Sequence, residues 1–511
     1  MLTVLLSAFS AKADNSGDCG DGVTYTYNTA TKTLIINKSG EGTGAMNDYY
    51  FTGKNTSPWN SYRNDIQTII VESGVTSIGE YSFYFCNATS VEIAESVTSI
   101  GYGAFKDCKK ITSLSIPNSV VEIGGFAFSG MEALLSFVIP ESVTSIGKGA
   151  FSTCFKLQSI TLPNSITEIL DNTFYGCHSL VDVVIPDGVI SIGGDAFDDC
   201  EGLNTITIPN SVKTIKTNAF KNCTGLKRVN INGIESWCKI DFEDYGNPLY
   251  YAHSLYVNGN AVHELDIPDE IDAIKTRAFC GFSELQSINI GSSVTSIGEN
   301  AFLECTSLQE VTIPQSVVSI GSSAFSSCSN LKRVSLPPIQ TISSYTFSHC
   351  SSLQNILIPN GVNKIEQRAF YDCKNLQKLF IQSDVQIIEL GAFGNCIGLT
   401  DVYCYGIIPP VHNGYYKRDV SHMFMGSSFK TSTLHVPEAA VENYKNNDAY
   451  PWCDFGSIVA LTDEETKIEQ VINDSNEVEQ IYSLDGRRIE SLRKGVNIIK
   501  KGEKYIKLYV K

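Results

Sequence analysis

The stretch IPESVTSIGKGAFSTCFKLQSITL, residues 139–162, holds the pattern that decides the fold, and the same pattern starts again at Leu162. A phenylalanine marks the period and recurs in steps of 22 or 23 residues through two blocks of the chain: Phe83, Phe105, Phe128, Phe151, Phe174, Phe197 and Phe220, then Phe279, Phe302, Phe325, Phe347, Phe370 and Phe393. A period of this length predicts that each copy forms one coil of a solenoid. One coil cannot bury its apolar edge alone, so neighbouring coils must stack.

Each copy divides into three parts. Leu157–Leu162 has the apolar pattern of a short strand, which ends at Pro163 because proline cannot continue a hydrogen-bonded ladder. Val143–Gly147 is a second extended piece, closed by a glycine turn. Ala150–Leu157 has helical spacing and predicts a single helical turn that returns the chain to the next strand. The sequence therefore predicts a β-rich α/β solenoid with a parallel sheet and 22–23-residue coils.

The repeat resembles the BspA-like leucine-rich repeat family, whose signature is close to I-P-x-S-V-x-x-I-G-x-x-A-F-x-x-C-x-x-L. The resemblance covers roughly residues 66 to 400 and implies a leucine-rich-repeat curved rod. It also implies a secreted or bacterial cell-surface protein, because members of this family are typically secreted or attached to the cell surface. They are implicated in adhesion to host matrix proteins and to other cells.

The period has gaps that predict further parts of the chain. Leucine-rich repeats are expected over 66–230 and 266–400, with an N-terminal cap at 14–65 and a C-terminal cap at 401–460, since solenoids need atypical end units. Phe220 and Phe279 are 59 residues apart, which places an aromatic and acidic insertion at 231–265. We expect an ordered excursion over one face, with either a structural or a binding role.

Both ends of the chain carry sorting-type patterns. Residues 1–13 predict a signal peptide, because a short apolar stretch precedes Ala11-Lys12-Ala13; a short buried N-terminal segment is the alternative. Residues 461–480 are acidic and predict a linker. Residues 481–511 predict a small β module, and they resemble the C-terminal sorting domain of the type IX secretion system. That resemblance implies contact with outer-membrane secretion machinery; a β module that simply ends the chain is the alternative.

Composition limits the partners. The net charge of −17 repels nucleic-acid phosphates, and no basic stripe interrupts the acidic body, so nucleic acid is not expected as a partner. No apolar run approaches the roughly 18 residues that span a bilayer. We expect an extracellular protein or a cell-surface ligand as the partner.

Eleven of the sixteen cysteines share one repeat position, three residues after the phenylalanine. Met131 and Phe282 fill the same position in other coils, so the position is an apolar core slot. We expect stacked, buried thiols there, since buried cysteine packs as a small hydrophobe and the stacked geometry disfavours disulfides. The off-pattern cysteines leave a bridge among themselves open: Cys19, Cys238, Cys280, Cys404 and Cys453.

The sequence offers no recognised catalytic or metal-binding motif. It contains no C-x-x-C, no H-E-x-x-H and no G-x-S-x-G, and its seven histidines do not cluster. We therefore expect neither an enzyme nor a protein with a metal or a small-molecule cofactor. An enzyme or an enzyme accessory factor would need titratable residues to converge in 231–265 or in 405–430.

One column of residues suggests a binding site. The residue between the last two apolar positions of each strand faces solvent, and it is mostly small or polar along the array. On the last three coils it is Leu357, Phe380 and Tyr403, which predicts an exposed apolar contact surface. The alternative is that the C-terminal cap or the 405–430 loop folds over these side chains.

These observations lead to one hypothesis and one main rival. We expect an extracellular or cell-surface leucine-rich-repeat protein that mediates protein–protein interaction or adhesion to host or microbial macromolecules. The rival is a passive structural surface or scaffold protein without a specific ligand.

Overall fold

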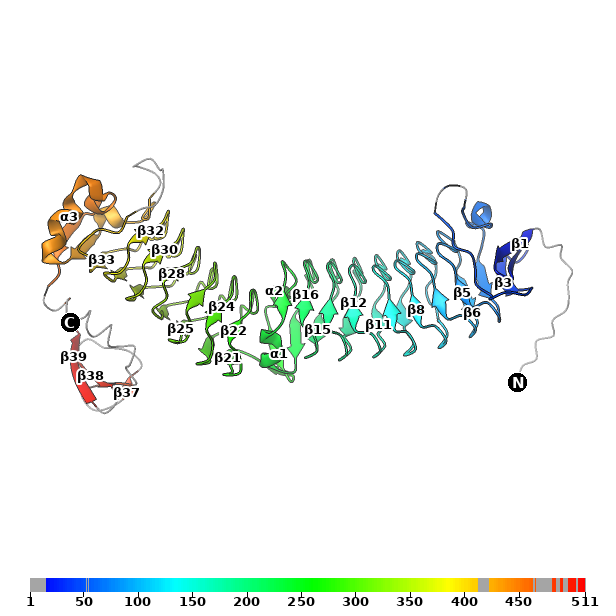
Figure 1. The fold of residues 1–511 in the computed structure, drawn as a ribbon, viewed down its shortest axis with the longest axis horizontal. Coiled ribbons are helices and arrows are strands. Elements are labelled where there is room, and N and C mark those ends of the chain that lie inside the picture. Colours follow the sequence, from blue (N-terminus) through cyan, green and yellow to red (C-terminus); the bar gives the residue numbers. More distant parts are fainter. Residues whose placement is uncertain are drawn as a thin grey trace. The chain divides into compact units, whose positions relative to one another are not determined.

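The structure is a computed structural model that describes residues 15–51, 53, 55–411, 422–462 and 465, together with the backbone of 480–483, 488–489, 495–501 and 504–510. The described residues belong to two compact units, 1–311 with 320–331, and 312–319 with 332–511. The predicted signal peptide lies outside the described residues. Each unit contains stacked coils with short parallel strands (Figure 1), so the predicted parallel-sheet solenoid is confirmed.

The first unit opens with a sheet that changes from antiparallel to parallel pairing. Its strands are β1 (Asn15–Gly20), β2 (Val23–Asn28), β3 (Thr33–Lys38), β4 (Thr68–Val71) and β6 (Ser90–Ile93), and the 3-10 turn η1 (Asn60–Tyr62) lies before β4. The antiparallel strands replace the coil that would otherwise precede the first repeat. We propose that this sheet is the expected N-terminal cap, since a solenoid needs an atypical unit over the end of its apolar core.

The repeats of the first unit then form two columns of parallel strands, which correspond to the two extended pieces predicted in each copy. The wide column contains β9 (Ser136–Val138), β11 (Ser159–Thr161), β13 (Asp182–Val184), β15 (Thr205–Ile208), β17 (Arg228–Ile231) and β19 (Leu255–Val257), then β20 (Asn260–Ala261), and it resumes with β21 (Glu264–Ile267), β23 (Ser287–Ile290) and β25 (Glu310–Thr312). The narrow column contains β5 (Ser77–Ile78), β7 (Ser99–Ile100), β8 (Glu122–Ile123) and β10 (Ser145–Ile146), then β12 (Glu168–Ile169), β14 (Ser191–Ile192), β16 (Thr214–Ile215) and β18 (Asp241–Phe242), then β22 (Ala273–Ile274) and β24 (Ser296–Ile297), and β26 (Ser319–Ile320) lies at the boundary of the two units.

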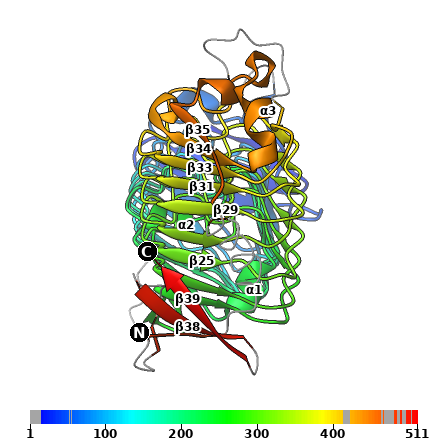
Figure 2. The same ribbon diagram turned by 90° about the vertical axis from the view of Figure 1, so that its left-hand side faces the viewer.

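The second unit repeats this design and ends in the segment that is expected to form the C-terminal cap. Its wide column contains β27 (Arg333–Ser335), β29 (Asn355–Ile358), β31 (Lys378–Ile381), β33 (Asp401–Cys404), β34 (Thr433–Val436) and β35 (Ser457–Ala460), and its narrow column contains β28 (Thr341–Ile342), β30 (Lys364–Ile365) and β32 (Ile387–Ile388). The cap adds η2 (Phe429–Thr431), η3 (Glu438–Ala440), α3 (Val441–Lys445), η4 (Asn447–Ala449) and η5 (Trp452–Asp454). Parallel pairing of β33, β34 and β35 means that the cap continues the sheet (Figure 2).

The predicted β module at the C-terminus is a four-stranded antiparallel sheet in the order β37-β36-β38-β39. Its strands are β36 (Gln480–Ser483), β37 (Arg488–Ile489), β38 (Gly495–Lys501) and β39 (Lys504–Val510). The hairpin expected from the alternating pattern is thus present as β38 and β39.

The helical turn predicted for Ala150–Leu157 is wrong, because this segment forms consecutive turns. Alternate N–H groups point in different directions: Phe151 donates to the carbonyl of Thr173 in the next coil at 3.0 Å, whereas Cys154 donates back to Phe151 at 3.3 Å. Thr153 has a φ of 57°, and a residue with positive φ stands at this position in most coils. The left-handed residues turn every second N–H outward, so the turn edge of one coil bonds to the next.

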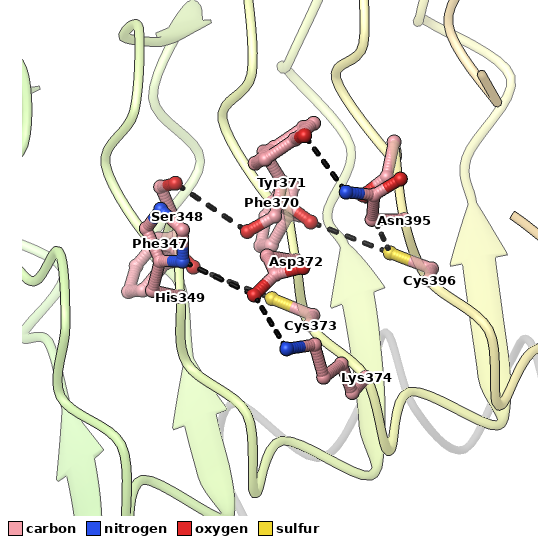
Figure 3. Close-up of polar contacts among 11 residues, drawn as sticks. Phe347, Ser348, His349, Phe370, Tyr371, Asp372, Cys373, Lys374, Asn395 and Cys396 are labelled. Atoms are coloured by element: carbon pink, nitrogen blue, oxygen red, sulfur yellow. Dashed lines mark hydrogen bonds and ion pairs between the residues drawn. The ribbon is translucent and has the colours of Figure 1, made fainter. Parts of the chain in front are cut away.

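The core contains two ladders that run from coil to coil. The repeat phenylalanines stack, for example Phe197 on Phe220 with centroids 5.1 Å apart and an interplanar angle of 6°. The predicted thiol slot is confirmed: Cys177 donates to the carbonyl of Phe151 in the preceding coil at 3.2 Å. Figure 3 shows the same contact from Cys373 to Phe347 at 3.3 Å. Most thiols of this slot thus donate to a carbonyl of the preceding coil in an otherwise apolar interior.

All sixteen cysteines lie within the described residues, and none of them is in a disulfide. Fifteen are buried, and Cys453 is half-buried. The bridge left open among the off-pattern cysteines is therefore not formed in this structure. Burial raises the pKa of the Cys154 thiol to about 12, and the buried Cys396 and Cys280 behave alike.

The insertion at 231–265 is an additional coil, and the expected excursion over one face is wrong. Within it, β18 pairs with β16 and β19 pairs with β17, both in parallel, so the segment continues both columns of strands. It also contains the helices α1 (Ile234–Cys238) and α2 (Leu249–Ala252) (Figure 1). Both columns of strands are interrupted directly after the insertion. In the wide column β20 turns back antiparallel onto β19, and the next sheet begins at β21.

We call the junction between the insertion coil and the coil that follows it, which begins with β21, the crease.

At the crease, side chains replace the backbone donors that connect coils elsewhere. The indole of Trp237 donates to the carbonyl of Ala278 at 2.8 Å, and Asn247 donates to the carbonyl of Arg277 at 2.7 Å. The ring nitrogen Nδ1 of His253 lies 2.9 Å from the carbonyl oxygen of Gly281. The carbonyls of the following turn edge are thereby satisfied although the regular coil is missing.

The other two tryptophans do the same at the ends of the repeats. Trp59 donates to the carbonyl of Ser82 at 2.8 Å, and Trp452 donates to the carbonyl of Pro410 at 3.0 Å. All three indoles are almost completely buried. Each tryptophan of the chain therefore stands where the regular coil-to-coil ladder stops.

We predict that a neutral aromatic disulfide reagent at pH 8 labels about one thiol in the native protein, namely Cys453, and all sixteen after denaturation. The thiolate is the reactive form, and buried thiols with a raised pKa stay protonated and covered. The absorbance of the released reagent measures the number of labelled thiols. Rapid labelling of several thiols in the native state would contradict the buried ladder.

The same burial predicts how stability depends on pH. Because unfolded thiols ionise at their ordinary pKa while the buried thiols stay protonated, the free energy of unfolding should fall as the pH rises from about 9 towards 12.

We predict that Trp237→Phe lowers the free energy of unfolding by about 1 kcal/mol, because the buried carbonyl of Ala278 loses one of its two side-chain donors and keeps the other, Asn247. Urea denaturation monitored by circular dichroism measures the change. Phe197→Leu is the comparison in the regular ladder, since it removes ring contacts but no hydrogen bond. A Trp237→Phe protein as stable as the parent would show that the indole hydrogen bond does not stabilise the crease.

Candidate functional site

The predicted binding residues form a continuous column on the sheet face of the second unit. Leu357 on β29 lies directly opposite Phe380 on β31, and Phe380 lies opposite Tyr403 on β33. The column continues through His435 on β34 to Val459 on β35 (Figure 2). The last two positions were missed because the cap lies outside the period, although the strand pattern at 434–437 repeats that of the coils.

Three rings of this column stack on one another. The centroids of Phe380 and Tyr403 are 4.6 Å apart with an interplanar angle of 12°, and those of Tyr403 and His435 are 4.4 Å apart at 16°. Offset stacking of this kind adds stability beyond the burial of the rings. The faces of the inner rings are therefore occupied by their neighbours, and the column presents ring edges outward.

Exposure differs along the column. Leu357 and Phe380 are half-buried, whereas Tyr403 is only 8% exposed. The covering groups seen here are the rings on either side, and His435 belongs to the C-terminal cap, which was one of the two covers considered from the sequence. Residues 412–421 of the 405–430 loop lie outside the described residues. Any ligand at this column would thus meet Leu357 and Phe380 before Tyr403.

Two carboxylates hold the polar end of the column. The His435 ring lies between Asp401, 3.3 Å from Nε2, and Glu465, 3.3 Å from Nδ1. Burial raises the pKa of Tyr403 to about 12, and the charges of Asp401 and Glu465 add to the effect. The phenol of Tyr403 is therefore neutral at physiological pH and contributes no negative charge to the column.

A second surface emerges only in the structure, on the turn edge of the first coils. Five rings form one connected set of contacts, and we call them the aromatic patch: Phe51, Tyr81, Tyr84, Phe85 and Tyr102. Phe51 is 54% exposed and Tyr102 is 38% exposed. The guanidinium of Arg63 lies 5.6 Å from the centroid of Phe85. Exposed aromatic surface of this kind commonly marks a contact site for another molecule.

The sequence did contain a signal for the aromatic patch. Tyr81, Tyr84 and Phe85 occupy the turn positions that hold Gly149, Ser152 and Thr153 in a later copy. Large rings at positions where the fold accepts small residues have no role in the core. A comparison of turn positions between copies, in addition to the strand positions, would have identified them.

The turn edge of the second unit carries a polar cluster (Figure 3). Asp372 accepts from His349 at 3.2 Å and from Lys374 at 3.1 Å. Burial raises the pKa of Asp372, but the hydrogen bonds from Lys374 and His349 outweigh burial and hold the pKa below its usual value. The hydroxyl of Tyr371 accepts from Asn395 at 2.7 Å. These groups bond to one another across neighbouring coils, so the cluster serves to join turns.

Among the residues that the structure describes, no group of three or more histidine, cysteine, aspartate or glutamate side chains is placed to hold a metal ion. No helix in the described part of the chain is both long enough and apolar enough to cross a membrane.

The sequence matches the family model described as BspA type leucine rich repeat region (6 copies) over four ranges, residues 60–181, 169–245, 252–339 and 336–417. These ranges span more than half of the chain. A search of curated proteins finds no match.

Several solved structures are similar to this chain. A leucine-rich repeat protein from Bacteroides ovatus is 24% identical over 71% of this chain and 94% of its own, with a TM-score of 0.46. One from Eubacterium ventriosum is 27% identical over 81% of this chain and 95% of its own, with a TM-score of 0.34. A leucine rich cell surface protein from Faecalibacterium prausnitzii is 25% identical over 78% of this chain and 95% of its own, with a TM-score of 0.33.

We predict that Tyr403→Ala lowers the free energy of unfolding by about 3 kcal/mol, because it removes the ring between Phe380 and His435. Tyr403→Phe keeps both stacks and should change stability by less than about 0.5 kcal/mol. Leu357→Ala, at the open end of the column, should cost less than Tyr403→Ala. Urea denaturation measures all three. Equal losses for the alanine variants at 403 and 357 would contradict a stacked column centred on Tyr403.

Proposed function

Because the chain belongs to the BspA-type leucine-rich repeat family, we propose that it is an extracellular or cell-surface protein that adheres to host or microbial macromolecules through protein–protein contacts. The family supplies a repeat scaffold on which side chains can vary at surface positions. Adhesion needs an extended contact surface, and repeat scaffolds provide one.

The observation that carries this proposal is the aromatic patch. Tyrosine and arginine are the residue types that dominate the energetics of protein–protein interfaces, and Arg63 lies over Phe85 and Tyr84. Lys109 also approaches Phe85, with 5.8 Å between Nζ and the ring centroid. Rings held by one another lose little conformational entropy on binding, which favours their use as anchors.

The column of Leu357, Phe380 and Tyr403 is the second proposed contact surface. Its stacked rings are rigid, and the half-buried Leu357 and Phe380 offer apolar edges on the sheet face. A ligand that spans several coils can meet such edges in a row, since paired strands in a sheet lie about 4.8 Å apart.

Delivery to the cell surface is part of the same proposal. The antiparallel sheet of β36 to β39 supports a compact terminal module, and its sequence resembles a type IX sorting domain. We propose that outer-membrane secretion machinery recognises this module. The passive scaffold remains the rival, and it predicts no saturable binding.

We predict saturable binding of the purified full chain to at least one member of a panel of extracellular-matrix proteins and intact cells. Phe51→Ser combined with Tyr102→Ser should weaken that binding at least about tenfold, because it removes exposed rings from the aromatic patch. Surface plasmon resonance measures the affinity. Val318→Ser is the matched control, since Val318 is 71% exposed and lies in neither surface.

The outcomes separate the alternatives. Loss of binding in Leu357→Ser with Phe380→Ser, while the patch variant still binds, would move the contact to the column. Binding that both double variants retain would exclude both surfaces. No saturable binding to any member of the panel would contradict adhesion and favour the passive scaffold.

A further inference from the structure

The crease encloses a cavity of about 330 Å³. Its walls come from the insertion coil and from the two coils that follow, and they include Asp244, Tyr245, Tyr250, Arg277, Asn300 and Leu303. All of these residues belong to the first unit. A volume of this size is at the lower end of the range for small-ligand pockets.

The cavity exists because the insertion coil is not a regular repeat. Helix α2 lies against Gly281, whose φ is +80° and whose added Cβ would stand 2.5 Å from the Cα of Tyr250. Only glycine permits this approach, which places the Tyr250 ring at the wall of the cavity. Side chains such as Asn247, rather than an unbroken backbone ladder, connect the turn edges here. The turns therefore do not close over the space as they do elsewhere.

One part of the lining is aromatic. Tyr245 is 55% exposed, and its ring centroid lies 6.2 Å from that of Tyr250 with the rings edge to face. Leu303 adds apolar surface from a later coil. A half-exposed tyrosine at a cavity mouth leaves a ring face open to a ligand.

The other part of the lining is polar but balanced in charge. Arg277 forms an ion pair with Asp244, and their side chains are 26% and 62% exposed. Asn300 brings an amide to the same space and donates to Glu299 at 3.2 Å. The lining thus combines donors, acceptors and a ring face. Within it the charges of Asp244 and Arg277 offset each other, and the carboxylates of Glu299 and Glu304 beside it disfavour an anion.

We propose that the crease is a saccharide-binding site that takes the terminal unit of a neutral glycan. A sugar ring presents C–H groups that pack on an aromatic face and hydroxyls that both donate and accept, which matches Tyr245 beside Asp244, Arg277 and Asn300. A balanced charge favours a neutral ligand, since a charged one would leave an unpaired charge in the pocket. An extended peptide fits less well, because strand addition needs a free sheet edge and this lining consists of turn and helix residues. The site shares no residue with the aromatic patch or the column, so this inference does not depend on the adhesion proposal.

The test uses the full chain and a panel of neutral oligosaccharides that end in glucose, galactose, mannose, fucose or N-acetylglucosamine. Isothermal titration calorimetry should detect saturable binding of at least one of them. Tyr245→Ala should weaken that binding at least tenfold, whereas Tyr245→Phe should stay within about twofold, because the ring face is retained. Asp244→Asn should also weaken the binding. Tyr50→Ala is the matched control, because Tyr50 is 64% exposed and is distant in sequence from the residues that line the cavity. Equal melting temperatures of the variants show that the fold is intact.

Three results would overturn the site. The first is that no oligosaccharide of the panel binds. The second is that binding is unchanged in both Tyr245→Ala and Asp244→Asn. The third is that these variants lose binding to a protein ligand and to no saccharide, which would make the crease a protein contact.

Discussion

The alternating hydrogen bonds of the turn edge are the constraint on which the rest of this structure depends. Every second N–H of a turn bonds to the next coil, and the others bond within the turn, as the pair Phe151 and Cys154 shows. This alternation requires left-handed residues at fixed positions and brings the coils into close stacking. Close stacking in turn aligns the phenylalanine rings and places most thiols of the repeat slot against a carbonyl of the preceding coil. The apolar core and the ladder of thiols are both consequences of how the backbone satisfies its own polar groups.

A ladder of this kind has ends, and the ends need other donors. Trp59, Trp237 and Trp452 supply an indole N–H at the first coil, at the crease and in the C-terminal cap. Tryptophan suits this role because one side chain provides both a large apolar ring and a donor. The positions of the three tryptophans therefore divide the chain into its regular and irregular parts. The surfaces proposed for binding lie on side chains that the ladder leaves free to vary.

Much of the fold could be predicted because the repeat fixes the spacing of its core. A 23-residue step puts Leu357, Phe380 and Tyr403 in one register, and the structure pairs these residues as expected. The thiol slot followed from Met131 and Phe282, which only an apolar site accepts. The turn was misread because apolar residues three and four apart indicate a helix, whereas here they face the core from consecutive turns. Periodicity of side chains does not reveal the direction of alternate N–H groups.

The surfaces were harder to predict than the core. The insertion was expected to leave the stack, but its own strands extend both columns, and its sequence gave no repeat signature to indicate this. The aromatic patch depends on rings from neighbouring turns, so it becomes visible only when copies are aligned at their turn positions. The cavity at the crease arises from imperfect stacking between unlike coils, which no pattern within one coil encodes. The sequence therefore predicts the strands and core positions that recur in every copy. The structure is needed for the surfaces and the cavity, which arise where copies differ from one another.

The uniform coil-to-coil bonding has a consequence for how such a chain can change over generations. A copy gained or lost by gene duplication or recombination presents the same alternate donors and acceptors to its new neighbours, so no backbone group is left without a partner. The array can therefore lengthen or shorten in units of one copy. The tryptophan joints cannot, because each indole supplies a donor at a place where the regular backbone donor is missing. The number of regular coils can therefore differ between related chains, whereas the positions of the tryptophan joints are expected to stay the same.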